Sequence, residues 1–224
     1  MSAAGATAAK ASVGRAPKTA AYEPIEFELT RVNGLTRESL DAHVKLYQAY
    51  VEQANEVFDA VRAGVSKADA RAAARARESL SRRWSFEASG VRLHEWYFEQ
   101  LDGNPGQRSP AASSVAMEAM DTAFGGFDAW LADVKSLSET RGVGWVVTLY
   151  CPVANLLANV WVDLHHLSVP AGQRVVFALD LWEHAYWKEF GAKGRKDYVQ
   201  AVIDNTYWRV VESRVSRASG SARV

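Results

Sequence analysis

Cysteine is nearly absent from this chain of 224 residues, which contains only Cys151. A single thiol excludes a disulfide framework, and it also excludes a metal cluster held by several thiolates. Neither sign of charge is in excess, because 26 acidic side chains balance 26 basic ones. No apolar run approaches the roughly 20 residues of a transmembrane helix. We therefore expect no nucleic-acid partner and no membrane partner, and the scarcity of cysteine suits a reducing compartment such as the cytoplasm.

The N-terminal segment differs in composition from the rest of the chain. Residues 1–22 are rich in Ala, Gly, Ser and Thr, and they carry three basic side chains but no acid. They contain no apolar stretch of the kind that a secretory signal needs. This composition favours a disordered tail over a transit peptide.

The first half of the chain shows helical periodicity. A helix is predicted to begin at Thr36, where acidic side chains in the first turn suit the helix dipole, and to end near Gly64. Its apolar positions recur at helical spacing: Leu40, Val44, Tyr47, Val51, Ala54 and Phe58. An arginine- and alanine-rich stretch at 66–83 and an aromatic stretch at 91–101 predict two further helices. The turn-forming residues that are concentrated at 102–110 then indicate a domain boundary.

Beyond residue 110 the period of the pattern changes. Apolar and β-branched segments predict three strands with short links, which suits antiparallel pairing. The predicted strands are 144–150, 156–162 and 174–180, and the predicted helices are 111–123, 127–138, 183–190 and 194–205. Helices followed by a few strands with helices around them indicate an α+β fold. We predict a disordered tail at 1–22, an N-terminal helical hairpin domain at 23–106, and a C-terminal domain at 107–224 with a three-stranded antiparallel sheet and surrounding helices.

Histidine is scarce, so each one is informative about function. The five are His43, His94, His165, His166 and His184. Asp180 ends a predicted strand and His184 follows four residues later, so a carboxylate oxygen and an imidazole nitrogen can lie near one point. His43 and His94 from the first half complete a candidate set of three histidines and one aspartate. Such a set suits iron, manganese or zinc better than calcium or magnesium.

Several segments together resemble the iron/manganese superoxide dismutase family, from about Phe27 to Arg214. They are Leu35 to His43 followed by Tyr50-Val51, Gly90 to His94, Gly142 to Trp145, Asp180 to Tyr186, and Arg195 to Tyr198 with Asn205 to Trp208. The resemblance implies a superoxide dismutase, which converts superoxide to dioxygen and hydrogen peroxide. It also implies one iron or manganese ion per subunit, bound by a solvent molecule and by His43, His94, Asp180 and His184. The sequence does not choose between the two metals.

The resemblance further implies roles for residues around the metal. Tyr50 matches the tyrosine that guards substrate access. A hydrogen-bond donor to the bound solvent is expected at His165, with His166 as the alternative, because Gly90 is too small to donate. Glu183 matches a glutamate that reaches a metal-ligating histidine of the partner subunit, which implies a homodimer or a dimer of dimers.

The substrate entrance departs from the family pattern. Its usual histidine is missing, with Leu46 or Tyr47 in that neighbourhood, and Trp187 replaces a tyrosine that would act across the dimer. Phe98 and Val147 stand where the family has tryptophans. We expect a superoxide dismutase with a more apolar entrance. The alternative is a relative that keeps the metal for another oxygen-dependent oxidation, whereas loss of catalysis is disfavoured because all four ligand residues remain.

Overall fold

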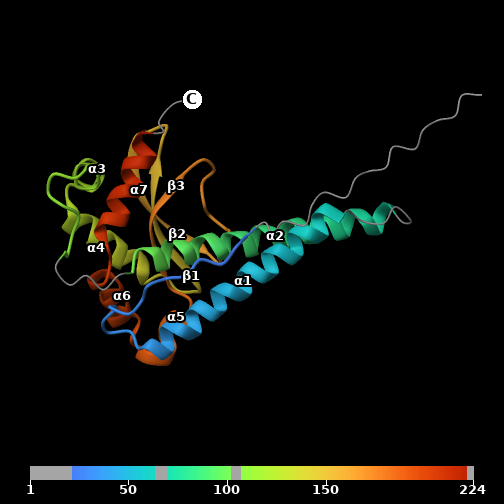
Figure 1. Cartoon of the computed structure of the whole chain (residues 1–224). Coiled ribbons are helices and arrows are strands. Elements are labelled where there is room, and N and C mark those ends of the chain that lie inside the picture. The colour runs from blue at the N-terminus through green and yellow to red at the C-terminus, as the bar shows by residue number, and fades with distance from the viewer. Residues whose placement is uncertain (1–21, 64–69, 102–106, 221–224) are drawn as a thin grey trace, which may run out of the picture.

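The computed structural model describes residues 22–63, 70–101 and 107–220, so the predicted tail lies outside the described residues except for Tyr22. The first half is a long helical hairpin of α1 (Arg37–Ala63) and α2 (Ala70–Glu99), which extends away from the rest of the molecule (Figure 1). Thr36 caps α1, because its hydroxyl oxygen accepts a hydrogen bond from the Ser39 N–H at 3.3 Å. One stripe of α1 is buried: Leu40, His43, Tyr47, Val51, Ala54 and Val57. This stripe contains the first candidate ligand.

The prediction of two separate helices at 66–83 and 91–101 is wrong, because α2 runs unbroken from Ala70 to Glu99. Gly90 lies inside the helix without ending it. A Cβ built on Gly90 would lie 2.8 Å from Cδ1 of Tyr50 on α1, which is far closer than two carbon atoms can pack. The glycine therefore marks a close contact between the two helices rather than a break.

The C-terminal half of the described chain contains one three-stranded antiparallel sheet. Its strands are β1 (Gly144–Cys151), β2 (Leu156–Asp163) and β3 (Arg174–Asp180), in the order β2-β1-β3. The central strand β1 is buried from Gly144 to Tyr150, as its continuous apolar sequence requires. In the β1–β3 register Trp145 is opposite Asp180, so the last residue of β3 lies beside a buried indole.

Five shorter helices of the described residues surround this sheet (Figure 1). They are α3 (Val115–Phe124), α4 (Phe127–Ser138), α5 (Glu183–Phe190), α6 (Arg195–Asp204) and α7 (Trp208–Gly220). Helix α7 is missing from the predicted elements, although its buried Trp208, Val211 and Val215 have helical spacing. Trp208 packs in an aromatic cluster with Trp130, whose ring centroid is 5.5 Å away. This cluster covers the sheet on the side of α4 and α7.

A side chain joins the hairpin to the sheet near the candidate site. The Gln100 amide donates to the Ala178 carbonyl oxygen and accepts from the Ala178 N–H at 3.1 Å, so it pairs with the backbone of the edge strand β3. The predicted α+β class, with a helical hairpin followed by a three-stranded antiparallel sheet, is confirmed. The domain division between 106 and 107 stays a prediction, since residues 102–106 lie outside the described part. Among the residues described, no helix is both long enough and apolar enough to cross a membrane.

Candidate metal centre

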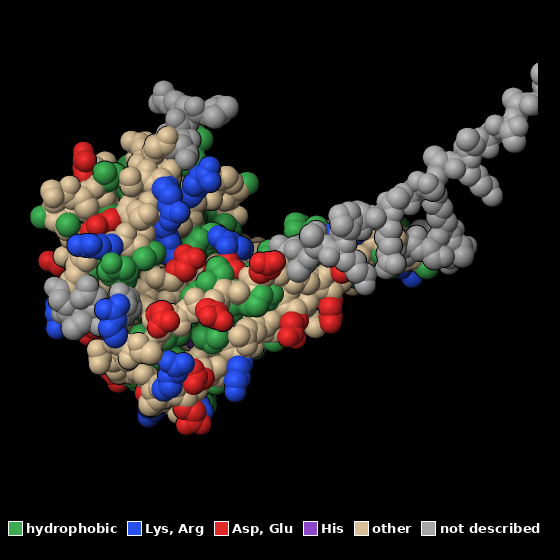
Figure 2. Space-filling view, in the orientation of Figure 1, with side chains coloured by type: hydrophobic (Ala, Val, Ile, Leu, Met, Phe, Trp, Pro, Cys, Tyr) green, Lys and Arg blue, Asp and Glu red, His purple; other side chains and the backbone are tan. Residues whose placement is uncertain are grey.

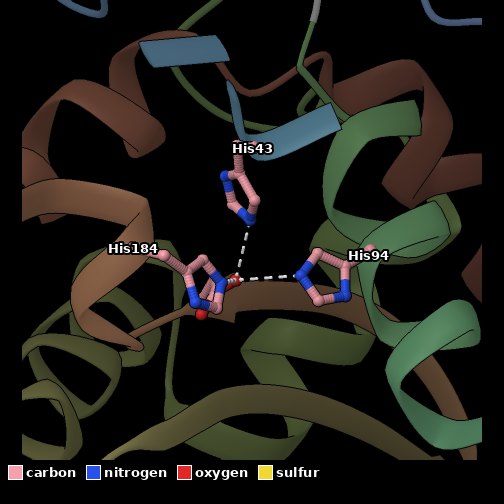
Figure 3. Close-up of side chains that lie close together, drawn as sticks. His43, His94 and His184 are labelled. Carbon is pink, nitrogen blue, oxygen red and sulfur yellow. Dashed lines mark hydrogen bonds and ion pairs between the residues drawn. The ribbon is translucent and has the colours of Figure 1, made fainter. Parts of the chain in front are cut away.

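Four candidate ligands from four different elements meet between the hairpin and the sheet. His43 lies on α1, His94 on α2, Asp180 at the end of β3, and His184 in the first turn of α5. The three imidazole rings point toward one carboxylate oxygen (Figure 3). The structure therefore brings together the four residues that the sequence predicted as a set.

The geometry of the group is compact. Asp180 Oδ2 lies 3.1 Å from His43 Nε2, 3.1 Å from His184 Nε2 and 3.6 Å from His94 Nε2. One ligand atom of each residue lies within 4.8 Å of all the others. The other carboxylate oxygen, Oδ1, accepts a hydrogen bond from the Trp182 N–H at 2.9 Å, which directs Oδ2 toward the histidines. Three of the four ligands are buried, and the His184 side chain is 23% exposed.

His94 carries the clearest sign that a cation belongs in this group. Its Nδ1 lies 2.7 Å from the Gly90 carbonyl oxygen, which can only accept, so Nδ1 holds the ring proton. Nε2 then carries a lone pair, and this buried atom has no hydrogen-bond partner among the described residues. Burial lowers the pKa of His94 well below its ordinary value, so a second proton is not available at neutral pH. A lone pair that points at a carboxylate oxygen is repelled by it unless a cation lies between them.

The charge of the group fits a cation as well. Burial alone would raise the pKa of Asp180, but the neighbouring His184 and His43 hold this pKa well below its usual range. Burial lowers the pKa of His43, although the nearby Asp180 acts in the opposite direction. At neutral pH the centre thus offers the ionised carboxylate of Asp180 beside the neutral imidazoles of His43 and His94. These donors fit iron, manganese or zinc, whose ligation by imidazole requires the neutral ring.

Tyr50 and His165 form a hydrogen-bonded chain beside the candidate ligands. The Trp145 Nε1–H donates to His165 Nδ1 at 3.0 Å, so the neutral His165 ring holds its proton on Nε2. That Nε2 lies 2.8 Å from the Tyr50 hydroxyl oxygen and donates to it. Burial lowers the pKa of His165 to about 4, which keeps the ring neutral. The Tyr50 ring also stacks on His94, with centroids 5.1 Å apart.

The predicted alternative, His166, lies in a different environment. The His165 ring centroid is 5.7 Å from that of His94, whereas the ring contact found for His166 is with Phe86, at 5.6 Å. The space beside Gly90 is filled by the Tyr50 ring rather than by His165. Of the two histidines, the structure therefore places His165 beside the candidate ligands, and its contact with bound solvent stays a prediction.

The predicted entrance residues separate into a core group and a surface group. Tyr47 is fully buried, and its hydroxyl accepts from the Ile25 N–H at 2.9 Å and donates to Glu95 at 3.2 Å. Leu46 is only partly buried, and Trp187 on α5 is 49% exposed. Tyr47 is thus a core residue, which leaves Leu46 as the apolar residue nearer the surface.

The other two replaced aromatic positions lie inside the protein. Phe98 is buried with its ring centroid 4.8 Å from that of His43, so it packs directly on a candidate ligand. Val147 is fully buried on β1, and it lines a pocket that also reaches His165.

Glu183 lies on the surface directly before His184. It is the first residue of α5 and is exposed. Within the described part of the chain, neither the Glu183 carboxylate nor His184 Nδ1 has a hydrogen-bond partner. Both groups are therefore accessible to a second subunit.

Two tryptophans in this region were not singled out as site residues from the sequence. Trp182 donates its backbone N–H to Asp180 and stacks on His165, with centroids 4.6 Å apart and planes 12° from parallel. Trp145 orients His165 through its indole N–H. Both tryptophans lie in segments that carry the family resemblance, so the sequence could have indicated that they belong to the site.

Comparison with known proteins agrees with this geometry. The C-terminal domain of the iron/manganese superoxide dismutases matches residues 112–214. An iron superoxide dismutase of Cupriavidus metallidurans is 29% identical over 199 residues, which cover 88% of this chain and 96% of the relative. A manganese superoxide dismutase of Haloarcula hispanica is 31% identical over 112 residues, or 50% of this chain and 74% of the relative. A superoxide dismutase of Aeropyrum pernix described as manganese/iron is 26% identical over 185 residues, or 81% and 82%.

The fold and the buried group of three histidines and one aspartate thus define a mononuclear metalloprotein with a helical hairpin and an α+β domain. The chain belongs to the iron/manganese superoxide dismutase family. Its relatives include iron-dependent and manganese-dependent enzymes, so either metal is a cofactor of this family.

Proposed function

We propose that this chain is a superoxide dismutase that uses iron or manganese bound by His43, His94, Asp180 and His184. The observation that carries the proposal is the buried Nε2 lone pair of His94, which points at the Asp180 carboxylate and has no hydrogen-bond partner in the described part of the chain. When bound, the ion would supply the one-electron redox chemistry that converts superoxide to dioxygen and peroxide. The four ligands are three neutral nitrogen donors and one anionic oxygen donor, with no sulfur among them. Such a set suits iron or manganese.

The reaction consumes protons, so the protein must deliver them. Two superoxide anions and two protons give one dioxygen and one hydrogen peroxide. Because His165 Nε2–H donates to the Tyr50 oxygen, the Tyr50 hydroxyl proton remains available for a different acceptor. Burial raises the pKa of Tyr50, so the hydroxyl is protonated at neutral pH. The Tyr50 hydroxyl is therefore our proposed proton donor near the metal, with His165 and Trp145 as the residues that position it.

The other two residues predicted at the substrate entrance, Leu46 and Trp187, cannot carry protons. Leu46 has no polar group, and the Trp187 indole can donate but cannot accept, so neither can relay a proton. Protons must then arrive through water and Tyr50. We expect the step that releases peroxide to be slower than in relatives with a polar gate.

A homodimer is part of the proposal. The exposed Glu183 carboxylate of one subunit would accept a hydrogen bond from Nδ1–H of His184 of the partner subunit, which would hold that ring with Nε2 toward the metal. The same unit could associate further into a dimer of dimers. The two-domain division and a cytoplasmic location also remain proposals that are based on the sequence.

The test is stopped-flow decay of superoxide with separately prepared iron and manganese forms. Catalytic decay well above the rate of the free metal is expected for at least one form. Tyr50→Phe should keep the metal and slow the peroxide-releasing step by about a hundredfold, the lower end of the range for general acid catalysis. Tyr150→Phe, a change of the same kind at the opposite end of β1 from Trp145, serves as the control. If both forms decompose superoxide no faster than the free metal, the dismutase assignment is wrong, and another oxygen-dependent oxidation becomes the favoured function.

A further inference from the structure

Tyr47 joins the two helices of the hairpin beside two of the candidate ligands. It lies four residues after His43 on α1, and its hydroxyl donates to Oε1 of Glu95, the residue after His94 on α2, at 3.2 Å. Tyr47 is fully buried, and Glu95 is 3% exposed. The hydrogen bond therefore crosses between the helices within about one helical turn of both ligands.

Other contacts fix the direction of this hydrogen bond. The Tyr47 hydroxyl oxygen accepts from the Ile25 N–H at 2.9 Å, so its own proton is left to point at Glu95. The second oxygen of Glu95, Oε2, pairs with the guanidinium of Arg92, whose side chain is 48% exposed. Both carboxylate oxygens of Glu95 thus have a partner, and the Tyr47 hydroxyl both donates and accepts.

The Tyr47 ring also packs close to the same two ligands. Its centroid lies 6.5 Å from that of His94 and 6.3 Å from that of Phe98. The Phe98 ring in turn packs on His43, with centroids 4.8 Å apart. A shift of the Tyr47 ring would therefore disturb the packing around both ligands.

Stability alone does not account for a buried carboxylate between these helices. The acidic side chains of α1 lie at the surface, as Figure 2 shows, and there they keep their hydration. Glu95 has lost most of its contact with water, and apolar residues of similar size often stabilise such an interface equally well. A buried polar pair adds a defined geometry, because its hydrogen bond forms only over a narrow range of distances and angles.

We infer that the hydrogen bond between Tyr47 and Glu95 is a clamp that sets the separation of His43 and His94. Tyr47 is then a positioning residue of the metal centre and not an entrance residue, because its hydroxyl faces α2 rather than solvent. Without the clamp, the two helices settle at a different separation and present a distorted set of ligands to the metal. The inference rests on the proposed ligand set but not on dismutation, because it concerns the affinity and geometry of the site.

Tyr47→Phe removes the hydroxyl and keeps the ring. Its affinity for manganese, measured by competition with a chelator, should fall about tenfold, the lower end of the range for changes to groups that orient metal ligands. The electron paramagnetic resonance spectrum of its ferric form should change as well, because this spectrum reports how the ligands are arranged around the ion. Tyr150→Phe is the matched control: Tyr150 is 1% exposed and its hydroxyl donates to Asn155, so the change removes a hydrogen bond of the same kind without altering either measurement.

Variants of Glu95 separate the hydrogen bond from the charge. Glu95→Gln keeps an oxygen that accepts from Tyr47, so it should retain the affinity and the spectrum of the parent. Glu95→Leu has no acceptor and should reproduce the defects of Tyr47→Phe. Arg77→Gln removes an exposed hydrogen bond to the Val61 carbonyl oxygen between the same two helices, and it should change neither measurement.

Parent affinity and spectrum in both Tyr47→Phe and Glu95→Leu would overturn the inference. A Glu95→Gln protein as impaired as Glu95→Leu would overturn it too, because charge rather than the hydrogen bond would then be responsible. The inference and the proposed function fail separately. A chain that binds manganese without dismutating superoxide contradicts the dismutase, whereas dismutation with unchanged affinity and spectrum in Tyr47→Phe contradicts the clamp.

Discussion

Gly90→Ala should destabilise this protein, although the same change in an ordinary helix is stabilising. Alanine is favoured over glycine in a helix interior by about 1 kcal/mol. At Gly90 the new Cβ would lie 2.8, 3.1 and 3.2 Å from Cδ1, Cε1 and Cγ of Tyr50. The ring cannot swing away freely, because it stacks on His94 at 5.1 Å and meets His165 edge-on at 4.8 Å.

The magnitude follows from these opposing effects. Overpacking of a filled interior costs about 1–3 kcal/mol, which exceeds the helix preference. The net loss should be about 1 kcal/mol, and the melting temperature should fall by about 2–4 °C for a chain of this size. The displaced Tyr50 ring should also lengthen its hydrogen bond to His165, so dismutation should slow while the metal stays bound.

Thermal and urea unfolding of the metal-loaded protein would measure the loss, with metal content and superoxide decay determined on the same samples. Gly220→Ala is the matched control, because a Cβ on Gly220 meets no atom of the described residues within 4 Å and should not lower stability. A Gly90→Ala protein that is more stable than the parent and equally active would refute the reasoning.

Three further predictions concern the metal and its surroundings. His94→Ala should lose nearly all metal and melt at a lower temperature, because metal binding is coupled to folding; full metal content in this variant would contradict the ligand assignment. His165→Ala should keep the metal but change activity and reduction potential, whereas His166→Ala should change neither, and the reverse result would mean that the two roles are exchanged. Glu183→Ala should weaken the dimer in sedimentation experiments and lower metal affinity by about 10- to 100-fold, while a parent protein that is fully active as a monomer would rule out the bridge.

Local patterns were enough to predict most of the elements and all four candidate ligands. The strand that ends at Asp180 and the helix that contains His184 are adjacent in sequence, so their spacing could be read directly. His43 and His94 were predicted as ligands because the segments around them resemble the family's ligand helices. The structure brings both to the Asp180 carboxylate.

The errors arose where a tertiary contact decides the outcome. The sequence predicted separate helices at 66–83 and 91–101, but α2 continues through Gly90. The Tyr50 ring of α1 packs so closely against this position that only glycine fits there. The same contact explains why the space beside Gly90 is not available to His165. No helix was predicted beyond residue 205, although Trp208, Val211 and Val215 of α7 recur at helical spacing.

Gln100 contributes to the position of Asp180 through hydrogen bonds to β3. Its side-chain amide pairs with both backbone polar groups of Ala178, two residues before Asp180 and six residues after His94. Arg214 on α7 in turn donates to the Gln100 oxygen, with Nη1 and Oε1 3.3 Å apart, and both side chains are buried. The distance between His94 and Asp180 is therefore set by hydrogen bonds that need no metal. A ligand pair that is held in this way loses little conformational entropy when the ion binds, so the metal adds its binding energy to a site that the fold has already assembled.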